Sequence, residues 1–233
     1  ATRLRTQDYA LSGAGAALAW NDRLELSVAR QSLDTGLTGA ALGLPGLHLK
    51  QTILGAKLRI AGDAVLDSDT WVPQIAVGVL HKTLDSSGLN TTLQALGAER
   101  DGTEVYVSAA KLFLAQGLLL NGTLRATNAN QNGLLGFGSA RRSGHRIQPE
   151  VSIAYLLRSD LAVGLEYRAK PDNLNHILCA DVLKEEAWED LFIAWTPSKN
   201  LALTLAYVDL GVIAPPFVSR KQNGWYLSSQ IAF

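Results

Sequence analysis

The sequence predicts an all-β fold, a single transmembrane antiparallel up-and-down β-barrel of about twelve strands that spans residues 1–233. Three observations predict it. Hydrophobic residues make up 47% of the 233 residues, yet no apolar run approaches the roughly 18 residues that a helical span needs. Short segments of alternating hydrophobicity recur from end to end. The connections between these segments alternate between short and long.

Each expected strand is about ten residues long and alternates apolar with polar side chains, as a strand with one lipid-facing side does. Eleven segments are visible, at 9–20, 23–34, 47–60, 71–82, 103–114, 118–129, 146–157, 161–170, 187–196, 201–210 and 224–233. Bacterial single-chain barrels have an even number of strands. We therefore interpret residues 2–5 as part of a twelfth strand, with the sequence beginning part-way through it. The alternative is that residues 1–8 fold back into the lumen.

The connections predict how the barrel is oriented. Tight turns are expected at 21–22, 115–117, 158–160 and 197–200, and long loops at 35–46, 83–102, 130–145, 171–186 and 211–223. Outer-membrane barrels have short periplasmic turns and longer extracellular loops. The tight turns are therefore expected at the periplasmic end, where the connection at 61–70 is longer than the others.

Aromatic residues of lipid-facing parity are expected to form a girdle at each membrane interface. The periplasmic girdle consists of Trp20, Trp71, Phe113, Tyr155, Trp195 and Phe233. Tyr9, Tyr167, Tyr207 and Trp225 lie near the opposite strand ends and are expected to form the second girdle.

The end of the chain, from Trp225 to Phe233, alternates apolar and polar residues and finishes on an aromatic. This pattern resembles the C-terminal signature of bacterial outer-membrane β-barrels. The resemblance implies a periplasmic C-terminus, the outer membrane of a Gram-negative cell, and recognition of the last strand by the barrel assembly machinery. The wider sequence is similar to a proteobacterial family of outer-membrane barrels described only as a domain of unknown function. That similarity runs through stretches such as 22–27, 61–67, 167–173 and 206–211, and implies fold and location.

Charged residues of inward parity form the candidate lumen and selectivity site, namely Arg23, Glu25, Lys57, Arg59, Arg125, Glu150, Glu166 and Arg168. Charges inside a low-dielectric wall should pair, because an unpaired one is costly. One interpretation is an ion-pair network that fills a narrow barrel. The other is a polar conduit with a constriction of Arg59, Arg125, Arg168 and either Glu150 or Glu166. Arg125 is expected to pair with Glu150 or Glu166.

Many other inward positions carry small residues, among them Gly13, Gly15, Gly164 and Ala206. Small side chains leave room for a pore or for a segment folded into it. The long loops at 36–47, 89–96 and 174–183 are rich in leucine. We expect these loops to pack on each other as a cap or to dip into the barrel mouth. An apolar entrance suggests hydrophobic cargo, and a compact lid explains it equally well.

Other classes of function receive little support. The net charge is zero, so no nucleic-acid partner is expected. Arg141, Arg142, His145 and Arg146 are expected either to contact lipopolysaccharide phosphates near the outer leaflet or to form a solvated charge run. The spacing of Asp63, Asp67 and Asp69 suits a calcium ion, but the glycine and glutamate of a calcium loop are missing. No metal or cofactor is therefore expected.

Enzyme activity is not expected, because His48, His81, His145 and His176 lie near outer strand ends without a nucleophile elbow or a spaced triad. The sequence favours an outer-membrane channel or transporter for a small molecule, hydrophobic in one interpretation, that crosses a narrow charged lumen. The alternative is a plugged structural or ligand-binding barrel. A lipid-modifying enzyme is the least favoured.

Overall fold

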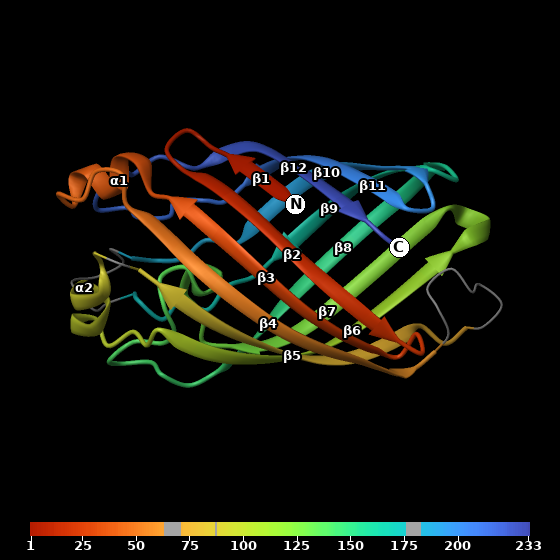
Figure 1. Ribbon diagram of the computed structural model, residues 1–233, viewed down its shortest axis with the longest axis horizontal. Coiled ribbons are helices and arrows are strands. Elements are labelled where there is room, and N and C mark those ends of the chain that lie inside the picture. Colours follow the sequence, from red (N-terminus) through yellow and green to blue (C-terminus); the bar gives the residue numbers. More distant parts are fainter. Residues whose placement is uncertain (63–70, 87, 176–182) are drawn as a thin grey trace.

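The computed structural model describes residues 1–62, 71–86, 88–175 and 183–233. Its strands form one closed antiparallel barrel in which each strand pairs with its neighbours in sequence and β1 pairs with β12 (Figure 1). The strands are β1 (Thr2–Arg5), β2 (Ala10–Trp20), β3 (Leu24–Asp34), β4 (His48–Ala61), β5 (Gln74–Asp85), β6 (Asp101–Phe113), β7 (Leu118–Thr127), β8 (Arg146–Arg158), β9 (Leu161–Arg168), β10 (Trp188–Ser198), β11 (Leu201–Asp209) and β12 (Asn223–Ile231). The helical segments are α1 (Gly36–Ala41), α2 (Asn90–Ala95), η1 (Leu114–Gln116) and η2 (Asn130–Gly133).

Residues 2–5 close the barrel. Thr2 pairs with Gly13 of β2 on one side and with Ser228 of β12 on the other. The predicted twelfth strand is therefore confirmed. The alternative, in which this segment folds back into the lumen, is wrong.

The short and long connections lie at opposite ends, with α1 and α2 together at the end that carries the long loops (Figure 1). The tight turn between β2 and β3 is centred on Asn21 and Asp22, each with φ of 51°. A β-turn of type I′ needs positive φ at both central positions, and Asn and Asp tolerate this conformation. Residues 63–70 of the longer turn, including the three aspartates of the candidate calcium loop, lie outside the described residues.

The outward face of the wall is apolar, since Leu26, Val28, Leu54 and Ile153 are all about half exposed on their strands. Of the predicted periplasmic girdle, Trp20, Trp71, Tyr155, Trp195 and Phe233 are exposed and Phe113 is partly buried. Trp71 precedes β5 and Phe233 follows β12, so both lie just outside their strands. None of the helices in the described ranges is long and apolar enough to cross a membrane.

Tyr9 does not belong to the second girdle, and that prediction is wrong. Its side chain is 4% exposed and its hydroxyl contacts Thr38 of α1. It belongs to a hydrophobic cap at the long-loop end, formed by Tyr9, Leu33, Leu47, Leu49, Leu84, Leu89, Leu93, Ala98 and Leu134. The predicted packing at the barrel mouth is confirmed for the loops at 36–47 and 89–96, whereas most of the loop at 174–183 lies outside the described residues. Tyr9 lies in the loop between β1 and β2. Side chains alternate between the two faces of the wall only within strands, so this alternation does not predict where Tyr9 points.

Candidate functional site in the lumen

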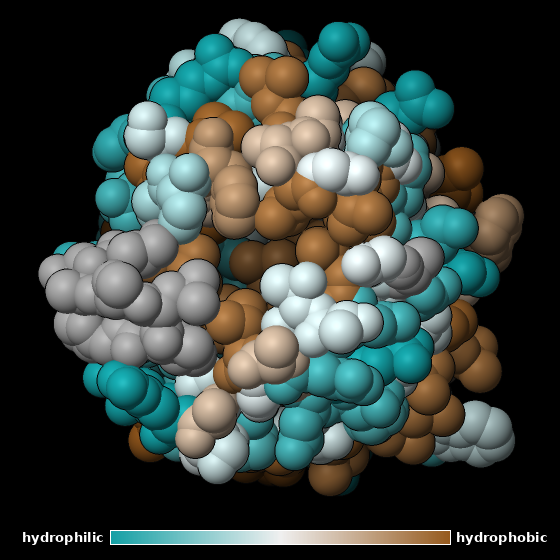
Figure 2. All heavy atoms as spheres, turned by 90° about the vertical axis from the view of Figure 1, so that its left-hand side faces the viewer, coloured by the Kyte–Doolittle hydropathy of each residue, from teal (hydrophilic) through white to brown (hydrophobic). Residues whose placement is uncertain are grey.

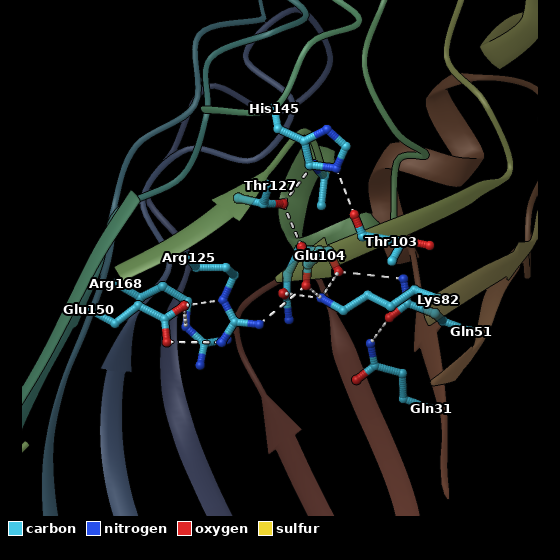
Figure 3. Close-up of polar contacts among 12 residues, drawn as sticks. Gln31, Gln51, Lys82, Thr103, Glu104, Arg125, Thr127, His145, Glu150 and Arg168 are labelled. Atoms are coloured by element: carbon cyan, nitrogen blue, oxygen red, sulfur yellow. Dashed lines mark hydrogen bonds and ion pairs between the residues drawn. The ribbon is translucent and has the colours of Figure 1, made fainter. Parts of the chain in front are cut away.

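A chain of alternating charges follows the inner wall of the barrel from β5 to β9. Lys82 Nζ lies 2.8 Å from Glu104 Oε2, which lies 3.2 Å from Arg125 Nη1. Arg125 also holds Glu150 through two hydrogen bonds, of 2.8 Å from Nε and 3.0 Å from Nη2. Glu150 Oε1 lies 3.2 Å from Arg168 Nε. Figure 3 shows Arg125 placed between the two carboxylates.

The register explains this arrangement. Glu150 pairs directly with Arg168, and Arg125 pairs with Tyr106, two residues from Glu104 on β6. Direct and diagonal neighbours on one face of a sheet are within reach of long side chains. The Arg125 guanidinium also lies over the Tyr106 ring, 5.4 Å from its centroid. The Arg125 guanidinium on β7 thus contacts side chains of both β6 and β8. Its N–H donors have a rigid, planar arrangement that is suited to such paired contacts.

The outer end of this chain is sealed from water. The Lys82 and Glu104 side chains are 2% and 1% exposed. Lys82 Nζ donates to both the backbone oxygen and the side-chain oxygen of Asn132, and Thr127 donates to Glu104. Buried charges persist only when they are paired and hydrogen-bonded, and this pair satisfies both conditions.

Asn132 belongs to the loop between β7 and β8, which folds into the barrel mouth. Residues 127–139 are almost entirely buried. Gln131 and Asn132 have φ of 46° and 59°, a conformation that non-glycine residues hold only when their surroundings impose it. Contacts from other loops supply that constraint, so the segment is a fixed partial plug.

One of these contacts is made by an ionisable pair in the loop between β9 and β10. Glu185 accepts a hydrogen bond from the Gln131 backbone N–H at 2.9 Å, and Lys170 donates to the Gln131 side chain at 2.6 Å. The Lys170 ammonium lies 4.0 Å from the Glu185 carboxylate, and both side chains are nearly inaccessible. Burial raises the pKa of Glu185 to about 7 and lowers the pKa of Lys170 to about 8.

A cavity of about 490 Å³ lies on the opposite side of the lumen from Lys82 and Glu104. Its wall comes from β1, β2 and β7–β12. Leu4, Phe192 and Tyr226 provide apolar surface, and Glu166 and Asp190 provide carboxylates. These two carboxylates are direct cross-strand partners, and neither forms an ion pair within the described residues. The cavity is therefore both apolar and acidic.

The small inward residues explain where the cavity lies. Thr204 and Ala206 of β11 line it directly. Gly164 of β9 faces Phe192, and a Cβ there would lie 2.4 Å from the ring. Strands β5–β9 instead carry the long side chains of the charge chain. One half of the lumen is thus filled and the other half is hollow.

The predicted lumen residues fall into two separate groups. Arg125, Glu150 and Arg168 join in the charge chain, and Glu166 lies in the 490 Å³ cavity beside them. The remaining four, Arg23, Glu25, Lys57 and Arg59, line a smaller cavity of about 240 Å³ at the tight-turn end of β3 and β4. Arg59 thus lines a different cavity from Glu150, Glu166 and Arg168. Of the two predicted partners of Arg125, Glu150 is found and Glu166 is not.

Sequence reasoning missed Lys82 and Glu104, the most buried members of the chain. Both have inward parity, since Lys82 follows Ala76 and Gly78 by even steps and Glu104 precedes Tyr106 by two. The alternation of inward and outward side chains along each strand was therefore enough to place both residues in the lumen. Their closeness depends on Asn132 and on the folded-in loop, which no strand pattern predicts.

The predicted histidines do not assemble a catalytic group in the described residues. His81 and His145 both contact Thr103, through its hydroxyl and its backbone oxygen respectively. Neither hydrogen-bonds to a serine or a carboxylate within the described part of the chain, and His176 lies outside it. Within the basic segment at residues 141–146, the Arg142 side chain donates a hydrogen bond to the Asp172 backbone oxygen at 2.6 Å. Its contact with lipopolysaccharide stays a prediction.

The closed barrel, its apolar outer face and its charged lumen define a membrane-type β-barrel. The chain belongs to the family described as "Protein of unknown function (DUF3034)", whose model matches residues 1–230. No curated protein matches the sequence.

Solved structures with a similar fold include porins and an enzyme. The NanC porin has a TM-score of 0.61 and 7% identity, with all of both chains covered. The KdgM porin has a TM-score of 0.57 and 11% identity, covering 100% of this chain and 96% of the other. An outer membrane phospholipase A from Escherichia coli has a TM-score of 0.50 and 8% identity, covering 99% and 88%. Identities this low establish a shared fold, and function must be argued from the site.

Proposed function

We propose that this protein is an outer-membrane channel or transporter that passes a small, partly apolar molecule along the hollow side of its lumen. The observation that carries the proposal is the 490 Å³ cavity beside the charge chain. The volume is within the usual range of small-molecule sites. The charge chain fixes one wall, and the small residues of the opposite wall leave the space.

The cavity lining supports a substrate that combines an apolar body with a positive charge or hydrogen-bond donors. Phe192 and Tyr226 offer aromatic surface on one side. Glu166 and Asp190 offer acceptors, and Asp190 Oδ1 is buried without a hydrogen-bond partner in the described structure. A donor on the substrate would satisfy this oxygen.

The long-loop end of the barrel supports entry of such a molecule. Figure 2 shows a hollow near the centre of this end, bordered by hydrophobic side chains, with hydrophilic residues toward the periphery. The apolar outer face and the exposed aromatic residues support placement in the bacterial outer membrane. Outer-membrane lipid and the barrel assembly machinery are the partners expected there.

Two variants on adjacent residues of β11 test the proposal. Thr204 lines the cavity, whereas Leu205 is 45% exposed on the outward face. Thr204→Trp should fill the hollow side and reduce conductance in planar bilayers, or solute entry in liposome swelling. Leu205→Trp should leave both unchanged, because its ring points into lipid.

A silent wild-type protein, or equal conductance in both variants, would contradict a channel. The first result would favour the alternative of a plugged structural or ligand-binding barrel, which the hydrophobic cap and the folded-in loop support. A lipid-modifying enzyme remains the least favoured function, because no described histidine has the partners that such chemistry needs.

A further inference from the structure

Four basic side chains point outward from one sector of the barrel, near the long-loop end. They are Arg3 and Arg5 on β1, Arg30 on β3 and Lys50 on β4, and all four are exposed. Cross-strand partners share a face of the sheet. Arg3 pairs with Leu227 and Arg5 with Trp225, which are 56% and 60% exposed on the lipid-facing side.

The register gathers these residues into one surface, here called the basic patch. One outward row consists of Arg3, Ser12, Ser32 and Lys50, each the direct partner of the next. Arg30 lies two residues from Ser32 on β3 and pairs with Thr52. Strands about 4.8 Å apart place Arg3 and Lys50 about 14 Å from each other. The patch thus combines four cations with three hydroxyl groups.

The patch lies at the level of the membrane interface. Trp225, the partner of Arg5, also pairs with Tyr207, and their rings meet edge to face at 5.3 Å. Exposed Trp and Tyr rings mark the depth of lipid headgroups. At this depth a long basic side chain reaches the headgroups without entering the hydrocarbon region.

Lys50 has a carboxylate, Asp85 of β5, as a direct cross-strand partner, whereas Arg3, Arg5 and Arg30 pair only with uncharged residues. None of these three arginines forms an ion pair with a described residue. On another sector of the rim two outward carboxylates, Glu189 and Asp209, pair directly across β10 and β11, and Lys221 lies 3.6 Å from Asp209. The three arginines of β1 and β3 therefore direct an anionic ligand to that side of the rim.

We propose that the basic patch binds the phosphate groups of a phosphorylated glycolipid in the outer leaflet. Arginine is suited to bidentate phosphate contacts, and neighbouring serine and threonine hydroxyls add hydrogen bonds. A membrane lipid is the occupant because the patch adjoins apolar, lipid-facing residues such as Leu227 and Val28. The proposal rests on the outer-membrane placement argued above, but not on channel activity.

Native mass spectrometry of the refolded full chain in detergent tests this proposal, with bis-phosphorylated lipid A as the probe. Each basic residue near an anionic lipid surface contributes about a factor of five in affinity. Arg3→Gln/Arg30→Gln should therefore bind lipid A roughly thirtyfold more weakly. The control Arg158→Gln/Lys199→Gln removes two charges near tight turns and should bind like wild type. Heat-modifiable migration on a gel checks that both variants fold.

Two further binding measurements test whether the lipid phosphates or free phosphate occupy the patch. Wild type should bind dephosphorylated lipid A as weakly as the double variant binds the intact lipid, and millimolar inorganic phosphate should not displace the lipid. Equal binding by wild type and Arg3→Gln/Arg30→Gln would overturn the proposal, as would displacement by inorganic phosphate. A change of oligomeric state in that variant alone would assign the patch to protein contacts instead. Bilayer conductance is recorded separately, so failure of the lipid site and failure of the channel are distinguishable.

Discussion

Replacing Glu104 with glutamine tests whether the charge chain stabilises the barrel. The substitution keeps the shape of the side chain and removes its charge. Lys82, which is 2% exposed, would keep only its two hydrogen bonds to Asn132. Arg125 would keep its paired contact with Glu150. Leaving one buried partner uncompensated costs about 3 to 5 kcal/mol. Because Lys82 keeps its Asn132 contacts, we expect a loss of about 3 kcal/mol in the free energy of unfolding.

Urea unfolding of the barrel in lipid, followed by tryptophan fluorescence, measures this loss. The double variant Lys82→Met/Glu104→Gln should return to within about 1 kcal/mol of wild type, since it removes the stranded charge. Glu25→Gln is the control, because Glu25 is partly exposed and should cost less than about 1 kcal/mol. A loss below about 1 kcal/mol for Glu104→Gln, or no recovery in the double variant, would refute the reasoning.

Two other predictions address the strand register and the folded-in loop. A Cβ at Gly122 would meet no atom within 4 Å, so Gly122→Arg should face lipid and lower the refolding yield at a cost of about 2 to 4 kcal/mol. Asn121→Arg, which faces the cavity, should insert normally, and equal yields would show that the register is wrong. For the loop, the Glu185 pKa of about 7 lies above its ordinary value of 4.5, so docking gains stability as pH falls from about 7 toward 4.5. The Lys170 pKa of about 8 lies below its ordinary value of 10.5, so its contribution is lost as pH falls through about 8. Hydrogen exchange at residues 130–138, corrected for intrinsic rates, should show more protection at pH 5.5 than at pH 7.5, and Glu185→Gln should remove this difference. Greater protection at pH 7.5 would contradict the assignment.

The strands could be predicted from sequence because alternation and turn length are local properties. Residues 2–5 were placed correctly because an even strand count is a global constraint that the local pattern alone does not supply. The pairing of Arg125 with Glu150 followed from parity and strand order. In contrast, the contact between Lys82 and Asn132 depends on positive φ at Gln131 and Asn132. Distant loops impose that conformation, and the hydrophobic pattern of the sequence does not indicate which loops contact this segment.

The two halves of the lumen explain how a narrow barrel can be rigid and still hollow. A twelve-stranded wall filled evenly by large side chains would leave no cavity, and one lined only by small residues would lack internal contacts. Here the long charged side chains of β5–β9 brace each other across five strands, with Arg125 joining Glu104 to Glu150. The folded-in loop closes the outer end of this braced side through Asn132. Such a network gives little net stability, because desolvation offsets most of the attraction. Its physical effect is to fix where the filled side lies, so that the glycine, alanine and threonine residues opposite keep their space.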